Sequence, residues 1–444
     1  MKSLRFNINT GFLFLFKIFI LTYTFIDLIR RFFDSSKVLL MSLDIIIVTT
    51  LFYFVATNKS KIRYINNVSI YLRVILFLFF IIILLQVFNP YYYDIKTYIV
   101  GFRSYLLAVP IILIGYHFSK YKLLLNKNMI DFIITLSTIT VIYAIFQLNT
   151  DYTLLAGSGM EFIAPMEHGI HSHGNDIVQL TSSFFASSKK YGHFLMIMYL
   201  IYIGISLSLY KKVNIFIVIL FIVALIVSGA RESFALFILV NFVLIIKFLN
   251  IKWWNIFLVF SIFSLILFIL FANDDLLLKI EFMFSTPDEY LRRIYMFFPF
   301  AFSDFSNPNM FFGLGVGKYG QETMLNPMLL DTTRGIDRVF FHDLGFFSSA
   351  YGFMDAGLAK VTIELGFLGI SIYLIFIVYI LYLAVKNIMY IGEDKLKLAF
   401  SLFIVLWVIY MMKAHPNISD ISMSYFLFFS IGYISYKDKK YNDK

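Results

Sequence analysis

The chain has 444 residues, of which 60% are hydrophobic and 14% charged, and its mean hydropathy is +0.82. A soluble globular chain carries about 25% charged residues, so the composition excludes that class and predicts a membrane protein. The absence of cysteine excludes disulfides, thiolate metal sites and a cysteine nucleophile. The formal net charge of +10 lies mostly in short basic clusters between apolar runs. That pattern indicates orientation in a membrane and not a nucleic-acid partner.

The apolar runs predict an all-α, polytopic membrane protein of about twelve transmembrane helices, because a bilayer core needs about 20 mostly apolar residues per helix. The expected spans are 11–29, 38–56, 69–89, 99–118, 129–147, 191–210, 213–228, 233–249, 254–272, 356–385, 397–412 and 421–436. The first run resembles a signal peptide, but no small-residue cleavage site follows it. We therefore expect an uncleaved first helix. The tenth run is long enough to tilt or to begin as an interfacial helix.

Lysine-rich connections follow every second expected span and predict which ends face the cytoplasm. These connections carry Lys59, Lys61 and Arg63, then Lys120, Lys122 and Lys127, then Lys211 and Lys212, then Lys247 and Lys252, then Lys386, Lys395 and Lys397, and last the 437–440 tail. Cytoplasmic connections of membrane proteins carry an excess of such charges. We expect a multi-pass protein of the cell inner membrane with both termini in the cytoplasm.

Three regions follow from the spans and from two long outer loops. Residues 1–272 hold spans one to nine with an outer loop at 148–190, residues 273–355 form a large outer loop, and residues 356–444 hold spans ten to twelve and a cytoplasmic tail. Long loops in compact proteins are usually functional or disordered. The large loop contains many aromatic and apolar residues, so we expect it to fold onto the helices.

Arginine is distributed differently from lysine. The residues expected on or near the outer face are Arg30, Arg31, Arg103, Arg231, Arg292, Arg293, Arg334 and Arg338. The guanidinium fork grips phosphate oxygens in pairs, which lysine does not do. The cluster therefore indicates a lipid phosphate or diphosphate ligand. The alternative is that these side chains reach lipid headgroups or pair with loop carboxylates, and for Arg30 and Arg31 this alternative is favoured.

Two of these arginines are stronger candidates. Arg103 lies several residues inside the fourth expected span, where an unpaired charge costs about 3 kcal/mol. Arg231 lies in the short connection 228–233, whose side chains must stay near the helices. The alternative for Arg231 is a local pair with Glu232.

Four segments carry a resemblance to a known family. They are Phe184–His193, which leads into a span, the Ser-Gly-Ala-Arg-Glu-Ser turn at 228–233, Arg292 or Arg293 followed by Gly-Leu-Gly-Val-Gly at 313–317, and His342 followed by Glu-Leu-Gly-Phe-Leu-Gly at 364–369. Their order, with the expected spans and the large outer loop, resembles the O-antigen polymerase and O-antigen ligase superfamily of bacterial envelope glycosyltransferases. The 22 positions between His342 and Glu364 exceed the spacing usual in that family.

The resemblance implies a metal-independent glycosyltransferase without a cofactor. Such a polymerase transfers a growing glycan from undecaprenyl diphosphate to a new lipid-linked repeat unit on the outer face, as in lipopolysaccharide and other polysaccharide biosynthesis. His342 and Arg231 are then expected to be catalytic. Arg103, Arg231, Arg292 and Arg293 are expected to bind the diphosphate, and Glu232 and Glu364 to support them. Expected partners are the lipid-linked oligosaccharide, membrane lipids and, as a further candidate, a chain-length regulator protein.

Other functions stay open at this point. A ligase of the same superfamily would move glycan onto lipid A core or a protein. A flippase or secondary transporter of lipid-linked sugars would show repeat symmetry and midplane charges, which the sequence lacks. A non-catalytic envelope scaffold is a further alternative. His168, His171 and His173 offer three imidazoles but no fourth zinc ligand, so no metal site is expected.

Overall fold

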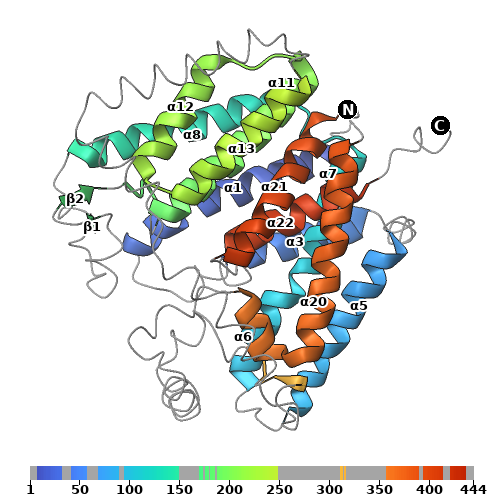
Figure 1. Ribbon diagram of the computed structural model, residues 1–444. Coiled ribbons are helices and arrows are strands. Elements are labelled where there is room, and N and C mark those ends of the chain that lie inside the picture. The colour runs from blue at the N-terminus through green and yellow to red at the C-terminus, as the bar shows by residue number, and fades with distance from the viewer. Residues whose placement is uncertain are drawn as a thin grey trace, which may run out of the picture. The chain divides into compact units, whose positions relative to one another are not determined.

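The computed structural model describes residues 8–32, 42–57, 69–89, 95–149, 170–173, 176–179, 181–185, 188–248, 311–313, 315–316, 357–389, 394–413 and 421–436. Within these ranges the protein is almost entirely α-helical, with one 3₁₀ turn and one two-stranded hairpin (Figure 1). The chain divides into two compact units that interleave along the sequence. The first comprises Met1–Ile46, Lys122–Thr286 and Ile391–Phe403, and the second comprises Ile47–Tyr121, Pro287–Tyr390 and Ile404–Lys444.

The first unit is built around one central helix. Its elements are α1 (Ile8–Phe32), α8 (Lys127–Asn149), the strands β1 (Ile170–His173) and β2 (Asp176–Gln179), α11 (Ser188–Tyr210), α12 (Ile215–Ser228) and α13 (Arg231–Phe248). Helix α11 packs against α8, α12 and α13. Its residues from Tyr191 to Ser206 are all buried. A helix that is apolar on every side belongs in the centre of a bundle, and α11 takes that place.

The second unit contains two helix pairs. Its elements are α5 (Ile70–Leu85), the 3₁₀ turn η1 (Gln86–Phe88), α6 (Ile95–Leu106), α7 (Ala108–Lys120), α20 (Gly357–Met389) and α22 (Ile421–Ser435). Helix α5 runs beside α20, and α7 packs along α22 (Figure 1). Two more helices, α3 (Ser42–Thr57) and α21 (Lys395–Lys413), each begin in the first unit and continue in the second.

Two glycines bring α7 and α22 into backbone contact. A Cβ atom at Gly115 would lie 2.1 Å from the carbonyl oxygen of Phe429, and a Cβ atom at Gly432 would lie 2.0 Å from the carbonyl oxygen of Ile112. Any larger residue at either position would push the helices apart. Small residues at such crossings are the usual means by which helices associate in a bilayer, where apolar burial alone gives no drive.

Several helices are suited to a lipid environment. Among the described residues, six helical stretches are long and apolar enough to cross a membrane: Asn9–Ile29, Ile70–Phe88, Gly101–Lys120, Lys127–Gln147, Ser188–Tyr210 and Glu364–Met389. Large apolar side chains also point outward from these and other helices, including Phe52 (70% exposed), Phe77 (62%) and Val378 (66%). Exposed apolar side chains on helices of this length fit a membrane protein.

The helical architecture expected from the sequence is confirmed, with one addition. Each expected span coincides with a helix except 254–272, which lies outside the described residues. In the loop expected at 148–190 the structure adds the antiparallel β1–β2 hairpin, in which His171 pairs with Val178 and His173 with Asp176. Of the loop 273–355, residues 311–313 and 315–316 are described.

Two expected spans are interrupted. Span 99–118 is interrupted for one residue at Leu107, whose φ of −64° and ψ of −16° stay in the helical region, because Pro110 has no N–H to donate to the Leu106 carbonyl and its ring crowds that oxygen. The long tenth span contains a break at Gly366, whose φ of 63° and ψ of −162° are outside the helical region. Such a conformation is accessible mainly to glycine. Both breaks lie in the second unit.

Candidate functional site

The short segment 311–316 is anchored on the end of α5 in the second unit. Gln86 Nε2 donates a hydrogen bond to the carbonyl oxygen of Phe312 at 2.7 Å. Asn89 Nδ2 donates to the carbonyl oxygen of Gly313 at 2.9 Å and to Gln86 Oε1 at 2.8 Å. Both amide side chains are buried. Carbonyl groups at the end of a helical turn have no partner within the helix, and these two amides supply partners for those of Phe312 and Gly313.

The same segment contacts the break in α20. The Gly315 N–H donates to the carbonyl oxygen of Glu364 at 3.1 Å. A Cβ atom at Gly313 would lie 2.5 Å from the Glu364 carbonyl, and a Cβ atom at Gly366 would lie 2.4 Å from the Gly313 nitrogen. The two glycines therefore permit an approach that no other residue would allow. The contact joins two of the motif segments noted in the sequence, Gly313–Gly317 and Glu364–Gly369.

Glu364 is fully buried at this junction. Its relative exposure is 0%, and its Oε2 accepts a hydrogen bond from the hydroxyl of Tyr105 at 2.7 Å. Tyr105 lies in the last turn of α6, two residues after Arg103 and two before the interruption at Leu107. A buried carboxyl group is costly unless it is hydrogen-bonded, so this contact helps to retain Glu364 in an apolar setting.

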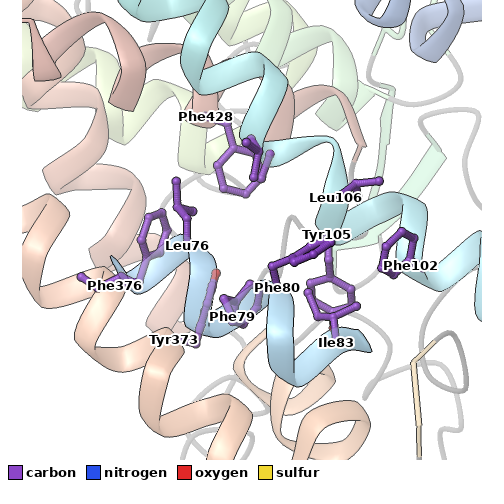
Figure 2. Close-up of a pocket in the computed structure, with 13 residues that line it drawn as sticks. Leu76, Phe79, Phe80, Ile83, Phe102, Tyr105, Leu106, Tyr373, Phe376 and Phe428 are labelled. Atoms are coloured by element: carbon purple, nitrogen blue, oxygen red, sulfur yellow. The ribbon is translucent and has the colours of Figure 1, made fainter. Parts of the chain in front are cut away.

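An apolar pocket borders the Tyr105 ring (Figure 2). Its lining is aliphatic and aromatic throughout and comes from α5, α6, α7, α20 and α22: Ile75, Leu76, Phe79, Phe80, Ile83, Phe102, Tyr105, Leu106, Ala108, Val109, Tyr373, Phe376 and Phe428. Phe79 holds Tyr105 edge to face at 5.7 Å between ring centroids. Tyr105 thus presents its ring to the pocket and its hydroxyl to Glu364.

In the first unit, the other two motif segments contact each other. Helix α12 ends at Gly229, whose φ of 62° is left-handed, and α13 begins two residues later at Arg231. The Ala230 N–H donates to Ser228 Oγ at 3.3 Å. A Cβ atom at Gly192, in the first turns of α11, would lie 2.0 Å from Ala230 Cβ. The Phe184–His193 segment and the 228–233 turn therefore fit together through a glycine.

A buried non-helical segment, Thr181–Phe185, precedes α11. Its five residues are all buried. Gln147 Oε1 accepts from the Ser183 N–H at 2.8 Å and Gln147 Nε2 donates to the Ser183 carbonyl at 3.1 Å, while the Thr181 N–H donates to the Val227 carbonyl at 3.3 Å. Ser183 has a φ of 50°, an uncommon conformation for a residue with a Cβ. The segment is held by α8 and by the end of α12.

An ion pair joins α1 to the start of α11. Lys190 Nζ lies 3.5 Å from Asp27 Oδ2, with the aspartate side chain 7% exposed and the lysine side chain 36% exposed. Lys190 lies two residues before Gly192, which contacts the 228–233 turn.

The residues expected at the site are described to different degrees. Arg103 is half-buried in α6, and Glu364 is buried in α20. Arg231 and Glu232 are the first two residues of α13, and their side chains are outside the description. Arg292, Arg293 and His342 lie outside the described residues. Arg231 and Glu364 belong to different units, and each is placed only within its own.

Three contacting residues were not singled out by the sequence. Tyr105, Gln86 and Asn89 all bond to the segments around Glu364 and Gly313. A signal existed for the two amides, because polar side chains at the end of the apolar run 69–89, just before Pro90, need a reason to be there. Tyr105 carried no such signal among the chain's 30 tyrosines.

Metal ligands do not gather in the part of the chain that the structure describes, where no group of three or more His, Asp or Glu residues is placed to hold an ion. His171 and His173 lie in β1. In comparisons with known proteins, no family model, no curated protein and no solved structure matches the chain.

Proposed function

We propose that the protein is a membrane glycosyltransferase that polymerises lipid-linked glycan repeat units. The growing glycan leaves its undecaprenyl diphosphate and joins a sugar hydroxyl of a new lipid-linked unit. The proposal includes twelve spans, both termini in the cytoplasm and a reaction on the outer face of the inner membrane. Its basis is the sequence resemblance, and the structure adds support through contacts between the motif segments.

The observation that carries the proposal is the contact between motif segments that lie far apart in the sequence. Gly313 and Gly315 contact Glu364 and Gly366 in one unit, and Gly192 contacts Ala230 in the other. The first contact lies where a transmembrane-length helix is broken. Discontinuous helices commonly form the ligand sites of membrane proteins, because freed backbone groups and buried side chains become available there.

The chemistry assigns a role to each predicted residue. Breaking the anomeric bond leaves a diphosphate, and fixed cations in a site of low dielectric stabilise its developing charge. Arg103, Arg231, Arg292 and Arg293 are the proposed cations, with Glu232 and Glu364 supporting them. His342 is the proposed base for the acceptor hydroxyl. The apolar pocket beside Tyr105 is suited in composition to part of the prenyl chain.

Purified protein and lipid-linked repeat units in detergent test the proposal directly. We expect a ladder of longer glycans, without added metal or nucleotide. Transfer of glycan to lipid A core or to a protein, in place of a ladder, would indicate the ligase. An unchanged substrate that crosses the bilayer of proteoliposomes would indicate a transporter and refute glycosyl transfer.

Arg231 gives the sharpest single-residue test. We expect Arg231→Ala to abolish the ladder and Arg231→Lys to restore little of it, because an ammonium group does not reproduce the bidentate grip of a guanidinium. Lys247→Ala, at the other end of α13, is the matched control and should leave the ladder intact. Normal ladders from the membrane-inserted Arg231→Ala protein would remove Arg231 from the site.

A further inference from the structure

The inference concerns Tyr105, and it rests on the proposed function. The residue joins two interrupted helices: its own helix α6 stops at Leu106, and the Glu364 that it contacts lies two residues before the break of α20. Tyr105 and Glu364 are 259 positions apart in the sequence. The contact is therefore a tertiary link between two helix ends.

The backbone of Glu364 is fixed independently of its side chain. The Gly315 N–H bonds its carbonyl oxygen, and the glycines at 313 and 366 pack against its peptide groups. Asn89 in turn holds Gly313. These backbone contacts do not fix the direction of the carboxyl group, because the glutamate side chain has three rotatable bonds. The Tyr105 hydroxyl bonds one carboxyl oxygen and so helps to fix that direction.

The ring of Tyr105 is itself held firmly. Its exposure is 4%, its partner Phe79 packs edge to face against it, and Phe79 stacks on Tyr373 of α20 at 6.1 Å between ring centroids. A hydroxyl on a packed ring has little freedom, so its position is set before any ligand arrives. Functional groups held by such packing and hydrogen bonds keep a productive geometry.

We propose that Tyr105 is a positioning residue that orients the Glu364 carboxyl group for glycan transfer. The hydroxyl donates to Oε2, and the residue also lines the apolar pocket. Tyr105 also shares the last turn of α6 with Arg103, so the same helix end carries a proposed diphosphate ligand and the residue that orients the carboxyl group.

Tyr98 offers a matched control on the same helix. It lies seven residues, or two helical turns, before Tyr105 and so on the same side of α6. Its hydroxyl also donates a hydrogen bond, at 3.0 Å, but to the main-chain carbonyl of Ile83. Tyr98→Phe and Tyr105→Phe each remove one hydroxyl and keep the ring. Only the second removes a bond to Glu364.

The test combines kinetics with a double-mutant cycle. We expect Tyr105→Phe to lower kcat by about tenfold or more, the scale of one hydrogen bond to a charged group, with little change in KM. Tyr98→Phe should keep the kcat of the unaltered protein. In thermal denaturation, Tyr105→Phe combined with Glu364→Met should cost less stability than the sum of the single changes, because two paired polar groups are removed together.

Each outcome decides a separate claim. Equal kcat for Tyr105→Phe and the unaltered protein, or equal losses for the two tyrosine variants, overturns the positioning role. Additive losses of stability in the cycle also overturn it, whatever reaction the protein performs. Absence of any glycan ladder from the unaltered protein refutes the proposed function, and the cycle still decides whether Tyr105 and Glu364 are coupled.

Discussion

Glu364 and Asp27 are carboxyl groups buried in two different ways. Glu364 is bonded by a neutral hydroxyl, and Asp27 lies 3.5 Å from the ammonium group of Lys190. A neutral hydroxyl adds no charge of its own to the apolar setting of Glu364. The ion pair instead uses a lysine whose side chain is 36% exposed, so its long stem reaches the buried aspartate from a partly accessible position. Because Lys190 is more exposed than Asp27, replacing one or the other should change the stability of the protein by different amounts.

We expect the two partners of the ion pair to be unequal in mutational cost. Lys190→Met removes a charged partner of the buried Asp27 carboxylate and should lower the free energy of unfolding by about 3 kcal/mol. Asp27→Asn leaves a lysine that can reach more polar surroundings, so its cost should be smaller. Thermal denaturation of both variants in detergent measures the order. A larger loss for Asp27→Asn would contradict this account.

The contacts around Glu364 depend on the helix interruptions more than on the regular parts of the helices. Helix α6 stops at Leu106 because of Pro110, α20 breaks at Gly366, and α5 ends in the 3₁₀ turn η1. The segment 311–316 contacts η1 and the break of α20, and Tyr105 connects α6 to the same place. At a helix end, backbone N–H and C=O groups lack hydrogen-bond partners within the helix. These groups are available for tertiary hydrogen bonds, which explains why the contacts lie there.

Pro110→Ala tests the need for the interruption at Leu107. An alanine restores the N–H that can bond the Leu106 carbonyl, so α6 and α7 should continue as one helix without loss of thermal stability. Arg103 and Tyr105 would then turn away from their present positions. A misplacement of one ångström can cost about 100-fold in rate, so we expect ladder formation to fall by at least about tenfold.

The control for this change is Leu113→Ala, which lies in α7 and leaves the backbone pattern unchanged. It should keep ladder formation near the level of the unaltered protein. Wild-type ladder formation by Pro110→Ala would show that the division of this helix has no part in the reaction.

The sequence predicted the helices better than their contacts. Apolar runs locate the helices because each must be long enough to cross a bilayer, and this physical requirement is local. The sequence analysis predicted 99–118 and 356–385 as unbroken spans and so missed the interruptions at Leu107 and Gly366, and the residues that these interruptions bring together are set by tertiary packing. Tyr105 shows the limit, since its partner lies 259 positions away and nothing near it in the sequence marks the pair. Arg103 could be singled out because charge is costly in an apolar run, and Glu364 because it belongs to a motif that carries the family resemblance.

At the scale of the whole molecule, the predicted orientation can be tested on the chain as it stands. Because the chain has no cysteine, a single introduced cysteine is the only thiol. In right-side-out vesicles we expect a membrane-impermeant maleimide to label Lys318→Cys directly and Lys212→Cys only after permeabilisation, as the lysine distribution predicts. Val378→Cys, on an exposed side of the apolar helix α20 that we expect to face lipid, should remain unlabelled in both conditions. Labelling of Lys212→Cys from outside would show that the orientation is the reverse of the predicted one.

The glycine contact between α7 and α22 also bears on how the protein is made. Helix α7 ends at Lys120 and α22 begins at Ile421, roughly 300 residues later. A ribosome that adds about 5–20 residues per second needs on the order of half a minute to reach α22 after α7 has entered the bilayer. During that interval the face of α7 that carries Gly115 cannot yet pack against α22. The second unit is therefore completed only after α22 has been synthesised, and a nascent chain that stops short of α22 should be a substrate for membrane proteases.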